Sequence, residues 1–389
     1  MRVAYLCADP GVPVFGSKGS SVHVQEIVRA WQRTGASVRV YCTSLGTDRP
    51  ADLGGLDVVQ EKPAPACGPE REQAVAAAAE MLAHRIAAEG CDLVYERYSL
   101  FSTGLASVVQ GLRVPGVLEV NAPLIEEQQR HRQLWDLDRA EAALRSNAGR
   151  ADVVACVSIP VVNWVRRYIP LAKTLLAPNG VNVNRITPAT TSHSTTGTLT
   201  VAFVGTLKPW HGLPGLVEAV ALANTGAGTV PRWRIRIIGD GPMRSVLESL
   251  AEKLQVAVDF TGAVRPDDVA PLLTACDAAC APYPVPEADH DDYFSPLKIF
   301  EYMAAAMPII ATATGQIPSI LVDGQTGLLV PAGDRRAFAD GLAALAADPA
   351  LRLRLGQAAR AEAVKRFSWE RVLSTITAAL PKTGKVVTP

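Results

Sequence analysis

The sequence has no excess of charge of either sign, because Lys and Arg together number 38 and Asp and Glu also number 38. A balanced chain has no bulk electrostatic attraction to nucleic acid or to an anionic membrane. The chain also lacks an apolar run long enough to cross a bilayer. The apolar run 3–6 is interrupted so soon by Asp9 and Pro10 that no signal peptide is expected. These absences predict a cytoplasmic protein whose partners include neither nucleic acid nor a membrane.

A regular cysteine pattern is missing as well. The seven cysteines are an odd number and are scattered without the spacing of metal ligands. We therefore interpret them as reduced and mostly buried thiols, and we predict no metal site. The hydrophobic content of 48% and charged content of 20% are typical of a globular chain.

What the chain does contain is an alternation of short apolar runs with amphipathic segments. Strands are predicted at 3–8 and 37–42, separated by a helical pattern over 22–31. The same alternation starts again in the second half with a strand at 200–204. At 389 residues the chain is long enough for two domains. We therefore predict an α/β fold with two doubly wound, Rossmann-like sheets.

The expected domain boundaries follow from one segment of unusual composition. Residues 187–197 are rich in Thr and Ser, which is typical of a linker. We predict a first domain over 1–187 and a second domain over 198–367. A final helix is expected over about 368–389.

The most informative stretch is 293–311, which predicts a loop, a short helix and a buried strand. Pro296 suits the start of this helix, where a missing N–H costs nothing, and Pro308 ends it. Lys298 and Glu301 are three residues apart and are therefore neighbours on the helix surface. A helix N-terminus that carries a lysine is a ready site for a phosphate group. The alternative is an ordinary solvated ion pair between the two side chains.

The sequence of 295–312, SPLKIFEYMAAAMPIIAT, resembles the nucleotide-sugar loop of the family-4 retaining glycosyltransferases. Several other landmarks of that family occur in order, so the resemblance spans nearly the whole chain. It implies the GT-B fold, in which two Rossmann-like domains face a cleft and a C-terminal helix crosses back to the first domain.

The resemblance also assigns the residues of the loop. Glu301 matches the second of the family's two glutamates, and Tyr293 occupies the place of the first. The acidic segment 287–292 either replaces that first glutamate at the sugar hydroxyls or is merely solvated. Lys298 and Glu301 are predicted as catalytic residues. Further donor contacts are predicted at Ser295, Pro296 and Leu297.

Other donor contacts come from glycine-rich turns. The turn that contains Gly19 and Ser20 precedes the first amphipathic helix and, in the resembled family, lies under the donor diphosphate. The family's usual arginine and lysine correspond to Thr206 and His211. We therefore expect Lys208, a further catalytic residue, to share the diphosphate charge with Lys298, and we expect no loss of activity through the histidine pH range. The remaining predicted donor contacts are Gly205, Thr206, His211, Gly239 and Val264.

The predicted acceptor side lies in the first half of the chain. Asn121 stands near the place of the family's active-site histidine and is predicted as a catalytic residue that can hydrogen-bond a sugar hydroxyl but cannot act as a general base. Glu126 and Glu127 begin a polar helix that either lines the acceptor site or is a solvated face. His23 is an acceptor contact or, equally, a residue that packs inside its helix.

The resemblance predicts a retaining, metal-independent glycosyltransferase. Its co-substrate would be a nucleoside diphosphate sugar of the UDP or GDP type, with no further cofactor, and its acceptor a small molecule or a glycan. A homodimer is compatible with this interpretation. Two alternatives stay open from the sequence: a nucleotide-sugar epimerase of GT-B type, and a non-catalytic sugar-nucleotide-binding partner subunit.

Overall fold

The computed structural model describes residues 1–188, 197–225, 232–286 and 293–381. The chain divides into two compact units. The first unit comprises Met1–Pro178, Tyr293–Ser295 and the segment from Trp369 onward, and the second comprises Asn179–Asp292 and Pro296–Ser368. Within the described ranges, no helix is long and apolar enough to cross a membrane.

The first unit contains a seven-stranded parallel sheet with the strand order β3-β2-β1-β4-β5-β6-β7. Its strands are β1 (Arg2–Cys7), β2 (Ser37–Cys42), β3 (Asp57–Gln60), β4 (Leu93–Arg97), β5 (Gly116–Val120), β6 (Val153–Cys156) and β7 (Thr174–Leu176). These strands are almost continuously apolar, because helices cover both faces of a doubly wound sheet.

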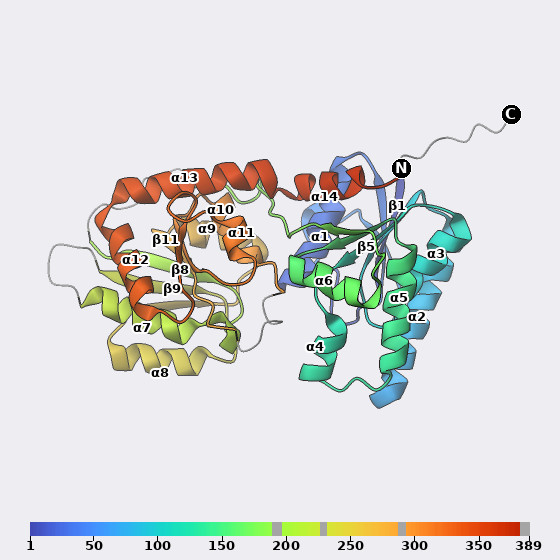
Figure 1. The fold of residues 1–389 in the computed structure, drawn as a ribbon, viewed down its shortest axis with the longest axis horizontal. Helices are drawn as coiled ribbons and strands as arrows, with labels where there is room; N and C mark the ends of the chain where they lie inside the picture. Colours follow the sequence, from blue (N-terminus) through green and yellow to red (C-terminus); the bar gives the residue numbers. More distant parts are fainter. Residues whose placement is uncertain (189–196, 226–231, 287–292, 382–389) are drawn as a thin grey trace. The chain divides into compact units, whose positions relative to one another are not determined.

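The helices of the first unit lie on the two faces of this sheet (Figure 1). The helices are α1 (Gly19–Arg33), α2 (Gly68–Glu89), α3 (Gly104–Leu112), α4 (Leu124–His131), α5 (Leu137–Arg150), α6 (Ile159–Tyr168) and α14 (Trp369–Ala378). Helix α14 packs against α1, while α2, α3 and α5 pack against one another. The largest buried cluster of this unit joins strand residues such as Leu6, Val94 and Leu118 to the helices α2, α3, α5 and α6.

The second unit contains a six-stranded parallel sheet with the order β10-β9-β8-β11-β12-β13. Its strands are β8 (Leu199–Val204), β9 (Trp233–Ile238), β10 (Val258–Gly262), β11 (Ala278–Ala281), β12 (Ile309–Thr312) and β13 (Leu328–Val330). Its helices are α7 (Leu213–Asn224), α8 (Arg244–Leu254), α9 (Pro266–Thr274), α10 (Leu297–Ala304), α11 (Ile317–Ile320), α12 (Arg335–Ala347) and α13 (Pro349–Arg366). Figure 1 shows α7 and α8 on one side of the strands and α10, α11 and α13 on the other.

Both strand orders reverse direction once, between β1 and β4 in the first sheet and between β8 and β11 in the second. In open parallel sheets the crevice at the carboxyl ends of the strands beside such a switch point is the usual ligand site. The fold class predicted from the sequence, two doubly wound Rossmann-like domains, is confirmed.

The first boundary between the units lies at Pro178, ahead of the position expected at residue 187. The reason is a set of backbone bonds that the sequence pattern does not reveal. Val181 N–H donates to the carbonyl of Phe367 at 2.8 Å. The guanidinium of Arg360 donates to the carbonyls of Val183 and Ile186 at 2.8 and 2.9 Å. Residues 179–186 therefore belong to the second unit, and most of the expected linker (189–196) lies outside the described residues.

The final helix is also shorter than expected, because α14 ends at Ala378. Its first residue, Trp369, is almost completely buried, and Val372, Leu373 and Ile376 form one apolar face. Beyond Ala378 the described chain continues only to residue 381, without further helix.

Candidate active site

Two glycine turns meet at the carboxyl edge of the second sheet. Gly205 follows β8 and has φ 137°, and Gly239 follows β9 and has φ 141°. A Cβ atom on Gly239 would lie 2.2 Å from the carbonyl oxygen of Gly205. No other residue fits this contact, because the backbone of one turn fills the side-chain space of the other. The two predicted donor positions are thus brought together, and their peptide groups line the edge of the sheet.

Helix α10 is fixed against this edge by a buried tyrosine. The phenol oxygen of Tyr302, which is fully buried, accepts the backbone N–H of Val204 at 2.9 Å. Val204 is the last residue of β8, so the bond joins α10 directly to the strand that leads into Gly205. This role of Tyr302 was not predicted from the sequence, because a tyrosine in an amphipathic helix indicates only that the residue packs in the core.

Lys298, on the same helix, projects into the interior of the unit rather than into solvent. Its side chain is only 8% exposed, and its Nζ has no hydrogen-bond partner within the described parts of the chain. The Nζ atom lies 4.1 Å from the centre of the Phe203 ring and 5.0 Å from the centre of the Tyr283 ring. Phe203 belongs to β8 and Tyr283 follows β11, so the ammonium group lies at the switch point of the sheet.

The energetics of this position argue for a ligand. A cation–π contact contributes about 0.5–2 kcal/mol, whereas removing an ammonium group from water costs several kcal/mol. Desolvation therefore dominates and lowers the pKa of Lys298 to about 7, although Cys280 and the carboxylate of Glu301 act in the opposite direction. The alternative of a solvated surface ion pair does not fit a side chain that is 92% buried.

His211 is neutral in this site. Its Nδ1–H donates to the carbonyl oxygen of Thr206 at 2.6 Å, which fixes the orientation of the ring. Burial, together with the charges of Lys298 and Lys208, lowers the pKa of His211 to about 3. Lys208 is half-buried, and its Nζ lies 5.5 Å from the centre of the exposed Trp210 ring. The imidazole is therefore not a cation of the site, and Lys208 and Lys298 are the candidates for that role.

The other predicted donor positions lie on or beside α10, after β10, and in the first unit. Pro296 is the N-cap residue of α10, Leu297 is its first helical residue, and Glu301 is half-buried one turn further along. Val264 lies in the loop after β10, at the same edge of the sheet. Ser295 is buried but belongs to the first unit. The acidic segment 287–292 lies outside the described residues.

In the first unit, a side chain of α1 holds the turn that precedes this helix. The side-chain amide of Gln25 donates to the carbonyls of Val14 and Gly16 at 2.9 and 3.0 Å. Helix α1 then begins at Gly19 without any side-chain cap, and Gly19 and Ser20 are exposed and half-exposed. The first N–H groups of an uncapped helix are available to an anion, as predicted for this turn.

His23 is not exposed to any ligand in this unit. It is 3% exposed, its Nε2 lies 2.5 Å from Oε1 of Glu119, and its ring packs edge-on against Trp369 at 4.7 Å. Burial alone would raise the pKa of Glu119, but His23 and then Arg97 lower it below its usual value. Of the two interpretations of His23, this geometry favours the helix-packing residue. Glu119 could not be predicted as the partner of His23, because the two residues are 96 positions apart.

Asn121, directly after β5, presents an unused amide. Both its Oδ1 and its Nδ2 are buried and have no hydrogen-bond partner within the described residues. Since an unpaired buried amide is costly, two such atoms on one side chain point to a ligand with hydroxyl groups. The catalytic role of Asn121 stays a prediction.

Glu126 and Glu127 are engaged in contacts within the first unit. Glu126 accepts the indole N–H of Trp164 at 2.6 Å and lies 3.6 Å from the guanidinium of Arg167. Glu127 accepts a hydrogen bond from the hydroxyl of Tyr293. Tyr293, at the place of the family's first glutamate, therefore holds a carboxylate instead of providing one. Neither glutamate is merely solvated, and an acceptor role for them stays a prediction.

Within the described ranges, no group of three or more His, Cys, Asp or Glu side chains is placed to hold a metal ion. The sequence does contain one Asp-x-Asp pair in a described region, Asp136 and Asp138. Asp136 is the N-cap of α5 and accepts the backbone N–H of Arg139 at 2.9 Å, which is a structural role.

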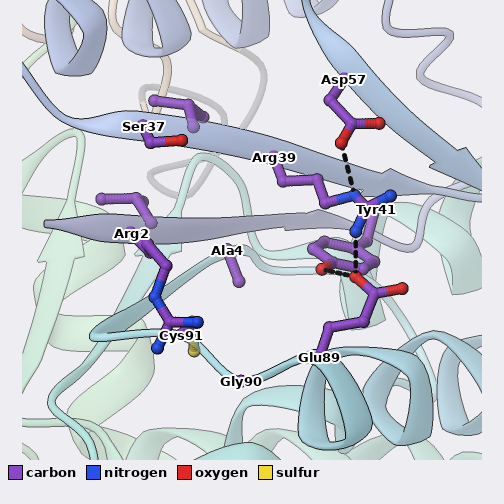
Figure 2. Close-up of a pocket in the computed structure, with 11 residues that line it drawn as sticks. Arg2, Ala4, Ser37, Arg39, Tyr41, Asp57, Glu89, Gly90 and Cys91 are labelled. Carbon is purple, nitrogen blue, oxygen red and sulfur yellow. Dashed lines mark hydrogen bonds and ion pairs between the residues drawn. The ribbon is translucent and has the colours of Figure 1, made fainter.

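A pocket of about 230 Å³ lies at the opposite, amino edge of the first sheet (Figure 2). Figure 2 shows Arg39 paired with Asp57 and with Glu89, and these contacts measure 2.9 and 2.5 Å. Arg2, which also lines the pocket, contacts Asp92 at 3.4 Å. The hydroxyl of Tyr41 donates to Glu89 at 2.5 Å as well. The charged side chains of this pocket already have partners, and the pocket lies at the amino ends of the strands rather than at their carboxyl ends. It is therefore not the candidate site.

Two family models match the chain. Residues 17–185 match the family described as Glycosyltransferase Family 4, and residues 198–348 match the one described as Glycosyl transferases group 1. D-inositol 3-phosphate glycosyltransferase of Actinosynnema mirum is 28% identical over 93% of this chain and 91% of its own. Phosphatidyl-myo-inositol mannosyltransferase of Mycobacterium leprae is 35% identical over 51% of each chain.

Solved structures share the fold. Sucrose-phosphate synthase of Thermosynechococcus elongatus has a TM-score of 0.71 at 20% identity, covering 97% of this chain and 98% of its own. HepE of Anabaena in complex with UDP has a TM-score of 0.71 at 18% identity, covering 97% and 99%.

Proposed function

The chain is a glycosyltransferase of the GT-B fold that uses nucleotide-sugar donors, and we propose that it is a retaining, metal-independent enzyme. Its donor is a nucleoside diphosphate sugar of the UDP or GDP type, and its acceptor is a hydroxyl group of a small molecule or a glycan. The observation that carries this proposal is the unpartnered Nζ of Lys298, buried at the switch point of the second sheet.

The diphosphate of the donor provides hydrogen-bond acceptors at the carboxyl edge of the second sheet. Phosphate oxygens supply the acceptors that Lys298 lacks, and Lys208 adds a second positive charge at the same loop. The turns at Gly205 and Gly239 let the backbone approach the phosphates without a side chain in the way. Glu301, one turn after Lys298, accepts the ribose hydroxyls of the nucleotide.

The reaction transfers the sugar on one face. The bond between the anomeric carbon and the phosphate oxygen breaks, and the acceptor oxygen bonds to the same carbon from the same side. The acceptor proton passes to the departing phosphate oxygen, so no separate carboxylate pair is needed, unlike in glycoside hydrolysis. Negative charge grows on the diphosphate as it leaves, and the two ammonium groups stabilise that charge more than they stabilise the intact donor.

The acceptor binds to the first unit through Asn121. The unpaired amide offers one acceptor and two donor positions, which suits neighbouring hydroxyl groups. Two similar proteins carry inositol in their names, D-inositol 3-phosphate glycosyltransferase and phosphatidyl-myo-inositol mannosyltransferase. A polyhydroxylated ring, free or phosphorylated, is therefore the first acceptor class to try.

A mass-spectrometric screen tests the proposal. The purified chain is incubated with UDP- and GDP-sugars, with and without inositol 3-phosphate and other hydroxylated acceptors, in the presence of EDTA. We expect release of UDP or GDP and an adduct of acceptor plus sugar whose anomeric configuration, read by NMR, matches the donor. An inverted product, or activity that returns only with added metal, would overturn the respective part of the proposal. Asn121→Ala should lose transfer but keep binding of the nucleoside diphosphate.

A further inference from the structure

Three described groups beside the ammonium group of Lys298 carry no charge that could balance its own. Two of its neighbours are the rings of Phe203 and Tyr283, at 4.1 and 5.0 Å. A third is the backbone of Gly205, which is so near that a Cβ atom added to this glycine would lie 3.5 Å from Nζ. Burying a charge without a hydrogen bond is more unfavourable than two cation–π contacts are favourable. These surroundings therefore favour the neutral amine form of Lys298 as long as no anion is bound beside it.

The titratable groups around Lys298 come from three elements. On α10 itself these are Glu301, half-buried, and Tyr302, whose pKa burial raises well above its usual value. At the end of β11, burial raises the pKa of both Cys280 and Tyr283, so both are neutral. The loop after β8 contributes Lys208 and His211, with the pKa of His211 lowered to about 3.

Of the described side chains near Lys298, Glu301 is acidic and Lys208 is basic, so their effects on the lysine oppose each other. The net effect of the surroundings is set by burial, which lowers the pKa of Lys298 to about 7. A lysine responds to burial in this way because its compact ammonium group is strongly hydrated in water.

We propose that Lys298 is neutral in the empty site at slightly alkaline pH and takes up one proton from the solvent when the donor diphosphate binds. The inference rests on the proposed function, because it places the diphosphate beside Nζ. The amine gains the proton, becomes an ammonium ion and donates charge-assisted hydrogen bonds to the phosphate oxygens. Donor affinity is thus coupled to pH through one named side chain.

Isothermal titration calorimetry with UDP and with GDP tests this coupling. At about pH 8.5 the terminal phosphate and neutral His211 no longer titrate, so a change in bound protons reports on the lysine. The same titration in Tris and in bicine, which differ in ionisation enthalpy, gives the number of protons taken up. We expect about one proton per nucleotide bound by the wild type, and a dissociation constant that rises about tenfold per pH unit above pH 8.

The variants separate the possible outcomes. Lys298→Met should bind the nucleotide more weakly and without proton uptake, and Lys298→Arg, which is always charged, should bind without uptake at any pH. Lys253→Met, an exposed lysine on α8, should keep the wild-type uptake. Wild-type binding without proton uptake overturns the inference and leaves the proposed function standing. Failure of both nucleotides to bind overturns both. If Lys298→Met fails to fold, the wild-type proton count and pH dependence still decide.

Discussion

The phenol oxygen of Tyr302 accepts the backbone N–H of Val204 at 2.9 Å, and both groups are buried. The bond attaches the last residue of β8 to α10, and Tyr302 lies one helical turn after Lys298. Because an N–H left without a partner in the core is costly, this single contact helps to fix the distance between the glycine turn at Gly205 and the lysine.

Removing that hydroxyl should destabilise the protein without emptying the core. Tyr302→Phe keeps the ring but leaves the N–H of Val204 unsatisfied, which costs about 1–3 kcal/mol of unfolding free energy. Urea unfolding followed by circular dichroism measures the loss, and an unchanged slope with denaturant shows that the folded state is otherwise the same. A midpoint equal to that of the wild type would show that the bond contributes nothing.

Glu301→Ala should weaken nucleotide binding and leave thermal stability nearly intact. A carboxylate that accepts two hydroxyl groups contributes on the order of 2–3 kcal/mol, which corresponds to a loss of roughly 30- to 150-fold in affinity. Calorimetry with UDP and GDP measures the change. Glu248→Ala, an exposed glutamate that pairs with Arg244 on α8, is the matched control and should bind as the wild type does. Equal affinities for the two variants would remove Glu301 from the site.

Lys298→Met and Lys208→Met should each slow turnover roughly 100-fold, by comparison with the loss of a single oxyanion donor. The control is again Lys253→Met, which removes an exposed ammonium group in the last turn of α8. Steady-state release of the nucleoside diphosphate is the measurement. Near-normal turnover in Lys298→Met would contradict a catalytic role for this lysine.

The pH profile distinguishes the two candidate cations. The charged form of Lys298 is the active one, and its pKa is lowered to about 7, so kcat/KM should fall as pH rises above about 7. The sequence alone led to the opposite expectation for this range, because an unperturbed lysine would stay charged. His211, whose pKa is lowered to about 3, is already neutral and contributes no change there. His211→Asn should therefore keep the decline; its disappearance in that variant would assign the charge to His211.

Glu96 should make the first unit less stable at neutral than at acidic pH. Its side chain is fully buried; burial raises its pKa to about 7, although hydrogen bonds from Ser102 and from the backbone N–H of Leu105 act in the opposite direction. A carboxyl group with a raised pKa stabilises the fold below its unfolded-state pKa and loses that contribution as pH rises through about 7.

Replacing the carboxyl group of Glu96 should remove this pH dependence. Glu96→Gln keeps an oxygen for the N–H of Leu105 and should raise the unfolding free energy at pH 8 by on the order of 1–3 kcal/mol. Denaturant unfolding at several pH values provides the measurement. If the variant and the wild type lose stability in parallel between about pH 4.5 and 7, another group is responsible.

The sequence by itself determined the architecture and the class of enzyme. Short apolar runs and period-3.6 apolar patterns are local, and they predict parallel sheets covered by helices because each buried face needs a partner. The stretch 295–312 also carried enough specific residues to identify a glycosyltransferase, which the family models confirm. Helix caps are equally local, since Ser158 and Asp334 accept the backbone N–H groups of Val161 and Ala337, three residues further along each chain segment.

The tertiary structure decided what each polar group can do. Along α10, Lys298 and Glu301 look like surface neighbours, but the lysine is buried because Phe203 and Tyr283, 95 and 15 residues away, fold over it. His23 lies on α1 and Glu119 on β5, and the two side chains meet only because the fold brings these distant segments together. Whether a charge is hydrated or enclosed depends on distant segments that converge at one sheet edge, and its pKa and its chemistry follow from that environment.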